Sequence, residues 1–127
     1  MTTRFEPNAG AILAYAEVWG PVGSFILQLA LDTGATRTVI NHAPLVSLRY
    51  DPTATNNRVQ VTMGATVEYS PVVQIDRIDA LGKSAKSLDI LAHTLPPSAG
   101  IDGVLGLDFL RGRKLAIDFV DGTIDLA

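Results

Sequence analysis

QLALDTGAT, residues 28–36, is the stretch around which the chain is organised. An apolar run ends there in an acidic residue, Asp32, which is followed by a hydroxyl residue and a glycine. A carboxylate is rarely buried unless another group pairs with it, so its placement at the end of an apolar strand suggests a purpose. Gly34 permits a tight turn in which backbone amides point at the carboxylate, and the Thr33 hydroxyl can bond the backbone of a neighbouring loop. An ordinary Asp-Thr-Gly turn is the competing interpretation, because Asp and Gly are common in turns.

A second segment, IDGVLGLDFL at residues 101–110, favours a catalytic role for the first. Together the two segments resemble the retropepsin-like aspartic proteases, which comprise the retroviral proteases and their single-lobe cellular and bacterial relatives. The resemblance extends in order and spacing over a domain of residues 11–127, and it leaves residues 1–10 as a polar, irregular N-terminal arm. It implies an aspartic endopeptidase that hydrolyses peptide bonds, with Asp32 as the catalytic residue.

The bulk composition is that of one globular domain. The 127 residues are 47% hydrophobic and 18% charged, which is enough for a modest core and argues against disorder. The formal net charge of −3 argues against a nucleic-acid partner. No apolar run reaches the ~18 residues of a membrane helix, and the N-terminus lacks the apolar core of a signal peptide. We therefore expect a cytoplasmic protein with no membrane contact.

The spacing of apolar residues predicts a mainly β protein, because alternating or β-branched runs lie between clusters of Gly, Pro, Asn and Asp. One or two helical turns are expected after Asn41, and Asp108 is expected to cap a short helix after the second motif. Together with the resemblance, this pattern predicts a closed, barrel-like single lobe of an acid protease, with one short helix after the second motif. The expected strands cover residues 11–19, 24–31, 38–40, 59–63, 66–69, 71–78, 86–93, 115–120 and 123–126.

Peptide hydrolysis without a metal or a nucleophilic side chain needs a base for the attacking water and a proton donor for the carbonyl oxygen. Two carboxylates that share one proton perform both tasks. The chain contains one Asp-Thr-Gly, so the second carboxylate has to come from another subunit. A twofold homodimer with Asp32 of each chain at its axis is the economical solution, and it is also the state that the resemblance implies.

The resemblance also implies supporting roles around Asp32. Thr33, Gly34 and Ala35 would form the active-site loop, in which Thr33 bonds the loop of the partner and Gly34 offers its backbone to the dyad and the substrate. The second motif would thread behind this loop and cover its underside with Val104, Leu105 and Gly106.

A hairpin between the two motifs occupies the position of the family's flap. Its strands are residues 59–63 and 66–69, and its tip consists of Met63, Gly64 and Ala65. Glycine gives the tip backbone freedom, and the tip amides can bond a bound peptide. A purely structural hairpin is the alternative interpretation of the same residues.

The other titratable residues are weaker candidates for chemistry. Asp102 is followed by Gly-Val rather than by the Thr-Gly or Ser-Gly that the family uses, which disfavours it as an internal second acid. His42 and His93 are isolated in the sequence, and there is no cysteine. We therefore expect no bound metal and no cofactor.

Two positions after the first motif depart from the retroviral members, which carry two acids where this chain has Thr36 and Arg37. An arginine beside the site favours acidic substrate side chains or a surface ion pair, so retroviral specificity is not carried over. The flap tip has one glycine rather than a glycine-rich run. These departures leave an alternative function open, namely a catalytically weak or inactive module that binds an extended peptide as an added strand.

Overall fold

The computed structural model describes residues 1–63 and 65–127, with Met63 described by its backbone alone. The described residues form ten strands and two short α-helices, with a 3-10 turn at Pro97–Ala99. The elements are β1 Thr2–Arg4, β2 Leu13–Gly20, β3 Gly23–Leu31, β4 Val39–Ile40, α1 His42–Ser47, β5 Arg58–Met63, β6 Thr66–Ala80, β7 Lys83–Ala92, β8 Gly103–Leu105, α2 Leu107–Leu110, β9 Leu115–Asp118 and β10 Thr123–Leu126.

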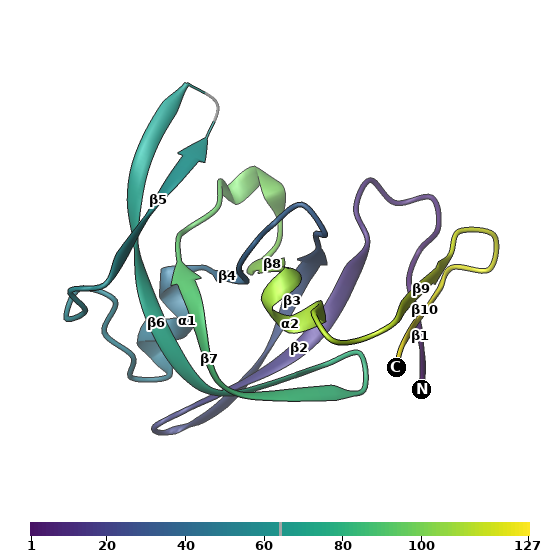
Figure 1. The fold of residues 1–127 in the computed structure, drawn as a ribbon, viewed down its shortest axis with the longest axis horizontal. Helices are drawn as coiled ribbons and strands as arrows, with labels where there is room; N and C mark the ends of the chain where they lie inside the picture. Colours follow the sequence, from purple (N-terminus) through teal and green to yellow (C-terminus); the bar gives the residue numbers. More distant parts are fainter. Residues whose placement is uncertain (64) are drawn as a thin grey trace.

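Six strands close into a barrel in the order β2-β3-β8-β4-β7-β6 (Figure 1). The ring closes because β2 pairs with β3 along its whole length and with β6 at residues 16–19. Strand β8 lies parallel to β3 and antiparallel to β4. The predicted mainly β, closed barrel-like lobe is therefore confirmed, as is the short helix after the second motif.

The core is built by the alternating side chains that the sequence pattern predicts. On β2, Ala14, Ala16 and Val18 point inward, while Tyr15 between them is 71% exposed. The helix α2 closes the core with Phe109, which is 2% exposed. The other large, fully buried side chains of the core include Leu29, Ile40, Leu45, Leu48, Ile75, Ile78, Ile90, Leu105 and Ile124.

The terminal segments form a separate three-stranded sheet in the order β1-β10-β9. The expected irregular course of residues 1–10 is wrong at Thr2–Arg4, because these residues pair with Thr123–Asp125 of β10. The polar composition of residues 1–10 did not indicate this strand, because one short edge strand needs few apolar residues. In Figure 1 both chain ends lie at this sheet, on one side of the barrel.

Strand β6 is a single strand of 15 residues, whereas the sequence predicted a break before Pro71. The strand continues because Pro71 stands where β6 exchanges partners: its pairing with β5 ends there, and its pairing with β7 begins at Val72. A missing amide donor is tolerated at such a point. The outer part of β6 and β5 form the expected hairpin, which projects from the barrel in Figure 1.

No helix among the residues described has the length and apolarity needed to span a bilayer.

Candidate active site

Asp32 follows directly on β3, at the start of the loop that leads to β4. Its backbone amide donates to the carbonyl of Leu105 at 3.0 Å, which fixes the end of the strand. Its Oδ1 accepts the Gly34 amide at 2.8 Å, and the residue is exposed. A Cβ at Gly34 would lie 3.1 Å from this oxygen, so glycine gives the carboxylate room to approach the amide. The loop therefore presents an oriented carboxylate to the surface.

The second motif lies directly beneath this loop. Strand β8 carries Val104 and Leu105 between β3 and β4, opposite Ala30 and Leu31 of β3. The Leu107 amide, just beyond, donates to the Ala35 carbonyl at 2.8 Å. These contacts connect the loop to β8 and α2 over a sequence separation of about 70 residues.

Gly106 makes this close approach possible. A Cβ at this position would meet the Ala35 oxygen at 2.8 Å and the Arg37 carbonyl carbon at 2.7 Å, both of which are backbone atoms. Because backbone cannot move aside as a flexible side chain can, only glycine fits here without a shift of the loop.

Asp108 does not cap α2 as the sequence predicted: the N-cap position is Gly106, and no side chain bonds there. Instead the Asp108 carboxylate reaches across to Thr38. It accepts the Thr38 amide at 2.9 Å and the Thr38 hydroxyl at 2.7 Å. The cap prediction is wrong because Asp108 is the second residue of this short helix rather than its N-cap, and its carboxylate there accepts from donors of the neighbouring loop.

Thr38 is a positioning residue that the sequence analysis missed. Its side chain is fully buried, and its Oγ1 also accepts the Gly106 amide at 3.1 Å. Thr38, Gly106 and Asp108 therefore form one network that joins the loop after Asp32 to the second motif. A threonine six residues beyond the candidate catalytic aspartate was interpreted only as a β-branched strand residue, and nothing else in the sequence distinguishes it.

Asp102 has a structural partner. Its Oδ2 accepts the Gln28 amide at 2.8 Å, and its own amide donates to the Gln28 carbonyl at 2.9 Å. The two acids of the second motif, Asp102 and Asp108, are thus both occupied by backbone donors.

Thr33 is exposed beside Asp32. Within the described part of the chain, its hydroxyl makes no hydrogen bond. The bond from Thr33 to a partner's loop, which the resemblance implies, therefore stays a prediction.

A groove separates the Asp32 loop from β5. It encloses about 440 Å³. Its walls are residues 34–37, Val39, residues 59–62 and Leu91. The hairpin β5–β6 and the Asp32 loop lie on the same side of the barrel in Figure 1. The groove has the position expected for a peptide that lies between the carboxylate and the hairpin.

The predicted flap tip is described in part. Met63 pairs with Thr66 in the last register position of the hairpin, and Ala65 is an exposed turn residue. Gly64 lies outside the described residues.

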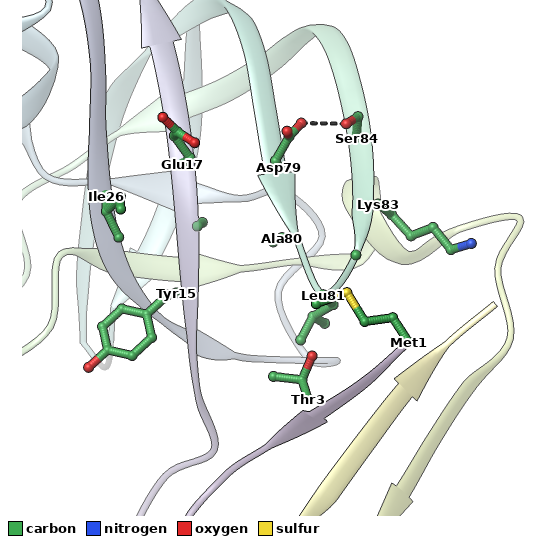
Figure 2. A pocket seen from close by; sticks show the side chains of 12 residues that line it. Met1, Thr3, Tyr15, Glu17, Ile26, Asp79, Ala80, Leu81, Lys83 and Ser84 are labelled. Atoms are coloured by element: carbon green, nitrogen blue, oxygen red, sulfur yellow. Dashed lines mark hydrogen bonds between the residues drawn. The ribbon is translucent and has the colours of Figure 1, made fainter.

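Another cavity, of about 490 Å³, lies elsewhere (Figure 2). Tyr15 and Ile26 line one side of it, and Met1 and Leu81 line another. The Asp79 carboxylate, which lines this cavity, accepts hydrogen bonds from the Ser84 hydroxyl and from the Arg77 guanidinium. The bond from Arg77 is the main cause that lowers the pKa of Asp79. No residue of either motif reaches this cavity, so it is not the site of the chemistry considered above.

Within residues 1–63 and 65–127, no group of three or more metal-ligating side chains comes together. His42 Nε2 lies 3.1 Å from the Ala92 carbonyl oxygen, and His93 Nδ1 lies 3.3 Å from the Ser70 hydroxyl. Both imidazoles thus have local structural partners.

Two solved structures share this fold. The retropepsin-like aspartic protease from Rickettsia conorii matches with a TM-score of 0.72 and 15% identity, over 100% of this chain and 91% of that one. The EIAV protease complexed with the inhibitor HBY-793 matches with a TM-score of 0.52 and 21% identity, over 87% of this chain and 96% of that one. The fold is therefore retropepsin-like, as the two motifs predicted.

A comparison with curated proteins gave no match. The family model of the gag-polyprotein putative aspartyl protease matches residues 22–112, a span that contains both motifs and the hairpin. Because this match covers most of the chain, the chain belongs to the family of gag-polyprotein putative aspartyl proteases.

Proposed function

We propose that the protein is an aspartic endopeptidase whose catalytic dyad consists of Asp32 from two subunits. The observation that carries this proposal is the exposed Asp32 carboxylate, oriented by the Gly34 amide on a loop anchored from beneath. The two acids of the second motif are committed to the backbone amides of Gln28 and Thr38. The second carboxylate of the dyad therefore comes from another copy of the chain.

With a twofold symmetry axis of the dimer beside the Asp32 loop, the partner subunit contributes its own Asp32 carboxylate in the same geometry. The two carboxylates then share one proton. The ionised one takes a proton from the attacking water, and the protonated one donates to the carbonyl oxygen of the scissile bond. Thr33, exposed next to Asp32, bonds the loop of the partner and keeps the two loops aligned. The end of the hairpin, with Met63 and Ala65, covers the peptide in the groove and excludes water.

The experiment compares wild type with Asp32→Asn on a diverse peptide library between pH 3.5 and 7.5, with products identified by mass spectrometry. We expect Asp32→Asn to lower the cleavage rate by at least about 1,000-fold, because an amide cannot accept the proton of the water. Asp76→Asn, the same substitution at an exposed aspartate of β6 outside the groove, serves as the matched control. Equal cleavage by wild type and Asp32→Asn would refute the proposal. Peptides that bind wild type without being cleaved would indicate the peptide-binding module instead.

A further inference from the structure

Among the described residues that line the groove between the Asp32 loop and β5, Arg37 is the only charged one. The other lining residues are glycine, alanine, threonine, valine, glutamine and leucine. Arg37 itself is half-buried. A peptide in the groove would therefore meet one cation and no anion among the lining side chains.

The other two half-buried arginines of the chain have partners within it. Arg77 binds the Asp79 carboxylate at 2.7 Å and lies 4.6 Å above the Trp19 ring. Arg113 donates to the carbonyl oxygens of Phe109 and Ser84 at 3.3 and 3.1 Å. Arg37, in contrast, makes no ion pair and no side-chain hydrogen bond with any described residue. A half-buried guanidinium loses part of its hydration, so an incoming carboxylate gains more from it than from a fully exposed arginine.

The backbone of Arg37 is held in place. Ala35 is bonded by the Leu107 amide, and Thr38 is bonded by Asp108 on the other side of Arg37. Gly106 packs directly against the Arg37 carbonyl group. The guanidinium is therefore attached to a fixed point, which reduces the ordering cost of binding a ligand.

The same groove contains Gly34, whose amide bonds the Asp32 carboxylate. A side chain that reaches Arg37 thus belongs to a residue close to the scissile bond. The formal net charge of the protein is −3, so its overall field does not attract acidic peptides, and any preference for them has to be local.

We propose that Arg37 selects substrates that carry an aspartate or glutamate side chain a few residues from the scissile bond. This inference rests on the proposed function, because it places a peptide substrate in the groove beside Asp32. It defines the substrate class as acidic peptides, and it assigns Arg37 as the residue that determines this specificity.

The test uses pairs of peptides that differ only by Asp or Asn at one position, moved through the four positions on each side of a cleaved bond. Assays run at pH 6, where a peptide carboxylate is ionised. We expect wild type to prefer the Asp peptide by about tenfold in kcat/KM at one position. The ratio should fall to about 1 in Arg37→Gln, and Arg37→Glu should prefer a Lys peptide at that position. Arg111→Gln, at an exposed arginine outside the groove, should keep the wild-type ratio.

A second arm separates this inference from the proposed function. The same peptide pairs are made with a non-cleavable hydroxyethylene unit in place of the scissile bond, and their Kd values are measured. Tighter binding of the acidic peptide that is lost in Arg37→Gln supports the role of Arg37 even if no peptide is cleaved. Equal Kd values for the Asp and Asn peptides, an unchanged ratio in Arg37→Gln, or no binding of any peptide would overturn the inference.

Discussion

The Asp32 loop and the outer hairpin face each other across the groove, but they are held in opposite ways. The loop is bonded from below by residues about 70 positions away, through Leu105, Gly106, Leu107 and Asp108. Beyond Ser70, the described residues of the hairpin are held by the pairing of β5 with β6 and by one contact to the barrel, in which Glu68 Oε2 lies 3.8 Å from His93 Nδ1. The hairpin side chains Val67 and Tyr69 are 50% and 65% exposed.

This difference indicates how the site divides its tasks. Under the proposed function, the Asp32 carboxylate has to meet a partner's carboxylate and needs a fixed position, which long-range hydrogen bonds to a buried threonine provide. The hairpin that would cover the groove has to open in order to admit and release a peptide. A two-stranded element of marginal stability can open without unfolding the barrel. The predictions below disturb one of these two regions at a time.

The largest effect is expected from Asp108→Ala, which removes the acceptor for both the amide and the hydroxyl of Thr38. We expect a loss of about 3 kcal/mol in the free energy of unfolding, because two donors at a buried residue lose their partner. Urea unfolding measures this loss, and peptide cleavage should fall with it. Asp76→Ala, at an exposed aspartate of β6, is the matched control. A change below about 0.5 kcal/mol in Asp108→Ala would show that the network does not hold the loop.

Thr38→Val tests the same network with less damage, because it keeps the Thr38 amide and removes only the hydroxyl. The Gly106 amide then loses its acceptor, which should cost about 1–2 kcal/mol. Cleavage should decrease more than stability alone explains when assayed well below the melting temperature. Thr53→Val is the matched substitution at an exposed threonine outside the groove, and it should change neither quantity appreciably. Equal effects of the two substitutions would contradict the assigned role of Thr38.

The hairpin is tested by hydrogen exchange. Amides in the ladder between Val59 and Thr62 should exchange at least about 100-fold faster than barrel amides such as those of Leu29 and Ile78, because the hairpin opens without disturbing the core. Mass spectrometry of peptic fragments resolves the two sets. Equal protection in both would mean that the hairpin unfolds only with the whole domain, and the division between a fixed loop and a movable cover would fail.

The smallest effect is expected far from the groove, at Asp79. Its pKa is lowered below the ordinary value of 3.8, first by the hydrogen bond from Arg77. A lowered folded-state pKa stabilises the protein above about pH 4, and this contribution disappears as the pH falls through the folded value. Asp79→Asn should therefore lower Tm at pH 7 by less than Thr38→Val does, and should make no difference near pH 2. Cleavage at pH 6 should stay unchanged, since Asp79 touches neither the loop nor the hairpin. A larger Tm difference at pH 2 than at pH 7 would contradict the assignment.

The sequence predicted the features that depend on local pattern and on the two motifs. Alternation along residues 11–19 and 24–31 identified the hairpin that ends at Asp32, and the resemblance carried by the two motifs predicted the closed lobe. The hairpin strands of β5 and β6 followed from their β-branched residues.

The features it missed depend on partners that are remote in the chain. Asp108 looked like a helix cap because its local sequence is that of a cap, and only the fold brings Thr38 to it. Strand β1 exists because β10 offers an edge, and β6 passes through Pro71 because its partner changes there. A local pattern contains none of this information, so these details required the three-dimensional structure.

Subunit mixing tests the central claim, that two chains share one catalytic dyad, most directly. Wild type and Asp32→Asn are unfolded together, refolded in varying ratios at constant total concentration, and assayed for cleavage of one peptide. If each active site needs Asp32 from both subunits, activity follows the square of the wild-type fraction, and an equal mixture retains about one quarter of the wild-type activity. Size-exclusion chromatography checks that all mixtures have the same oligomeric state. A linear dependence, with about one half of the activity retained in the equal mixture, would show that a single chain contains the whole catalytic apparatus and would contradict the shared dyad.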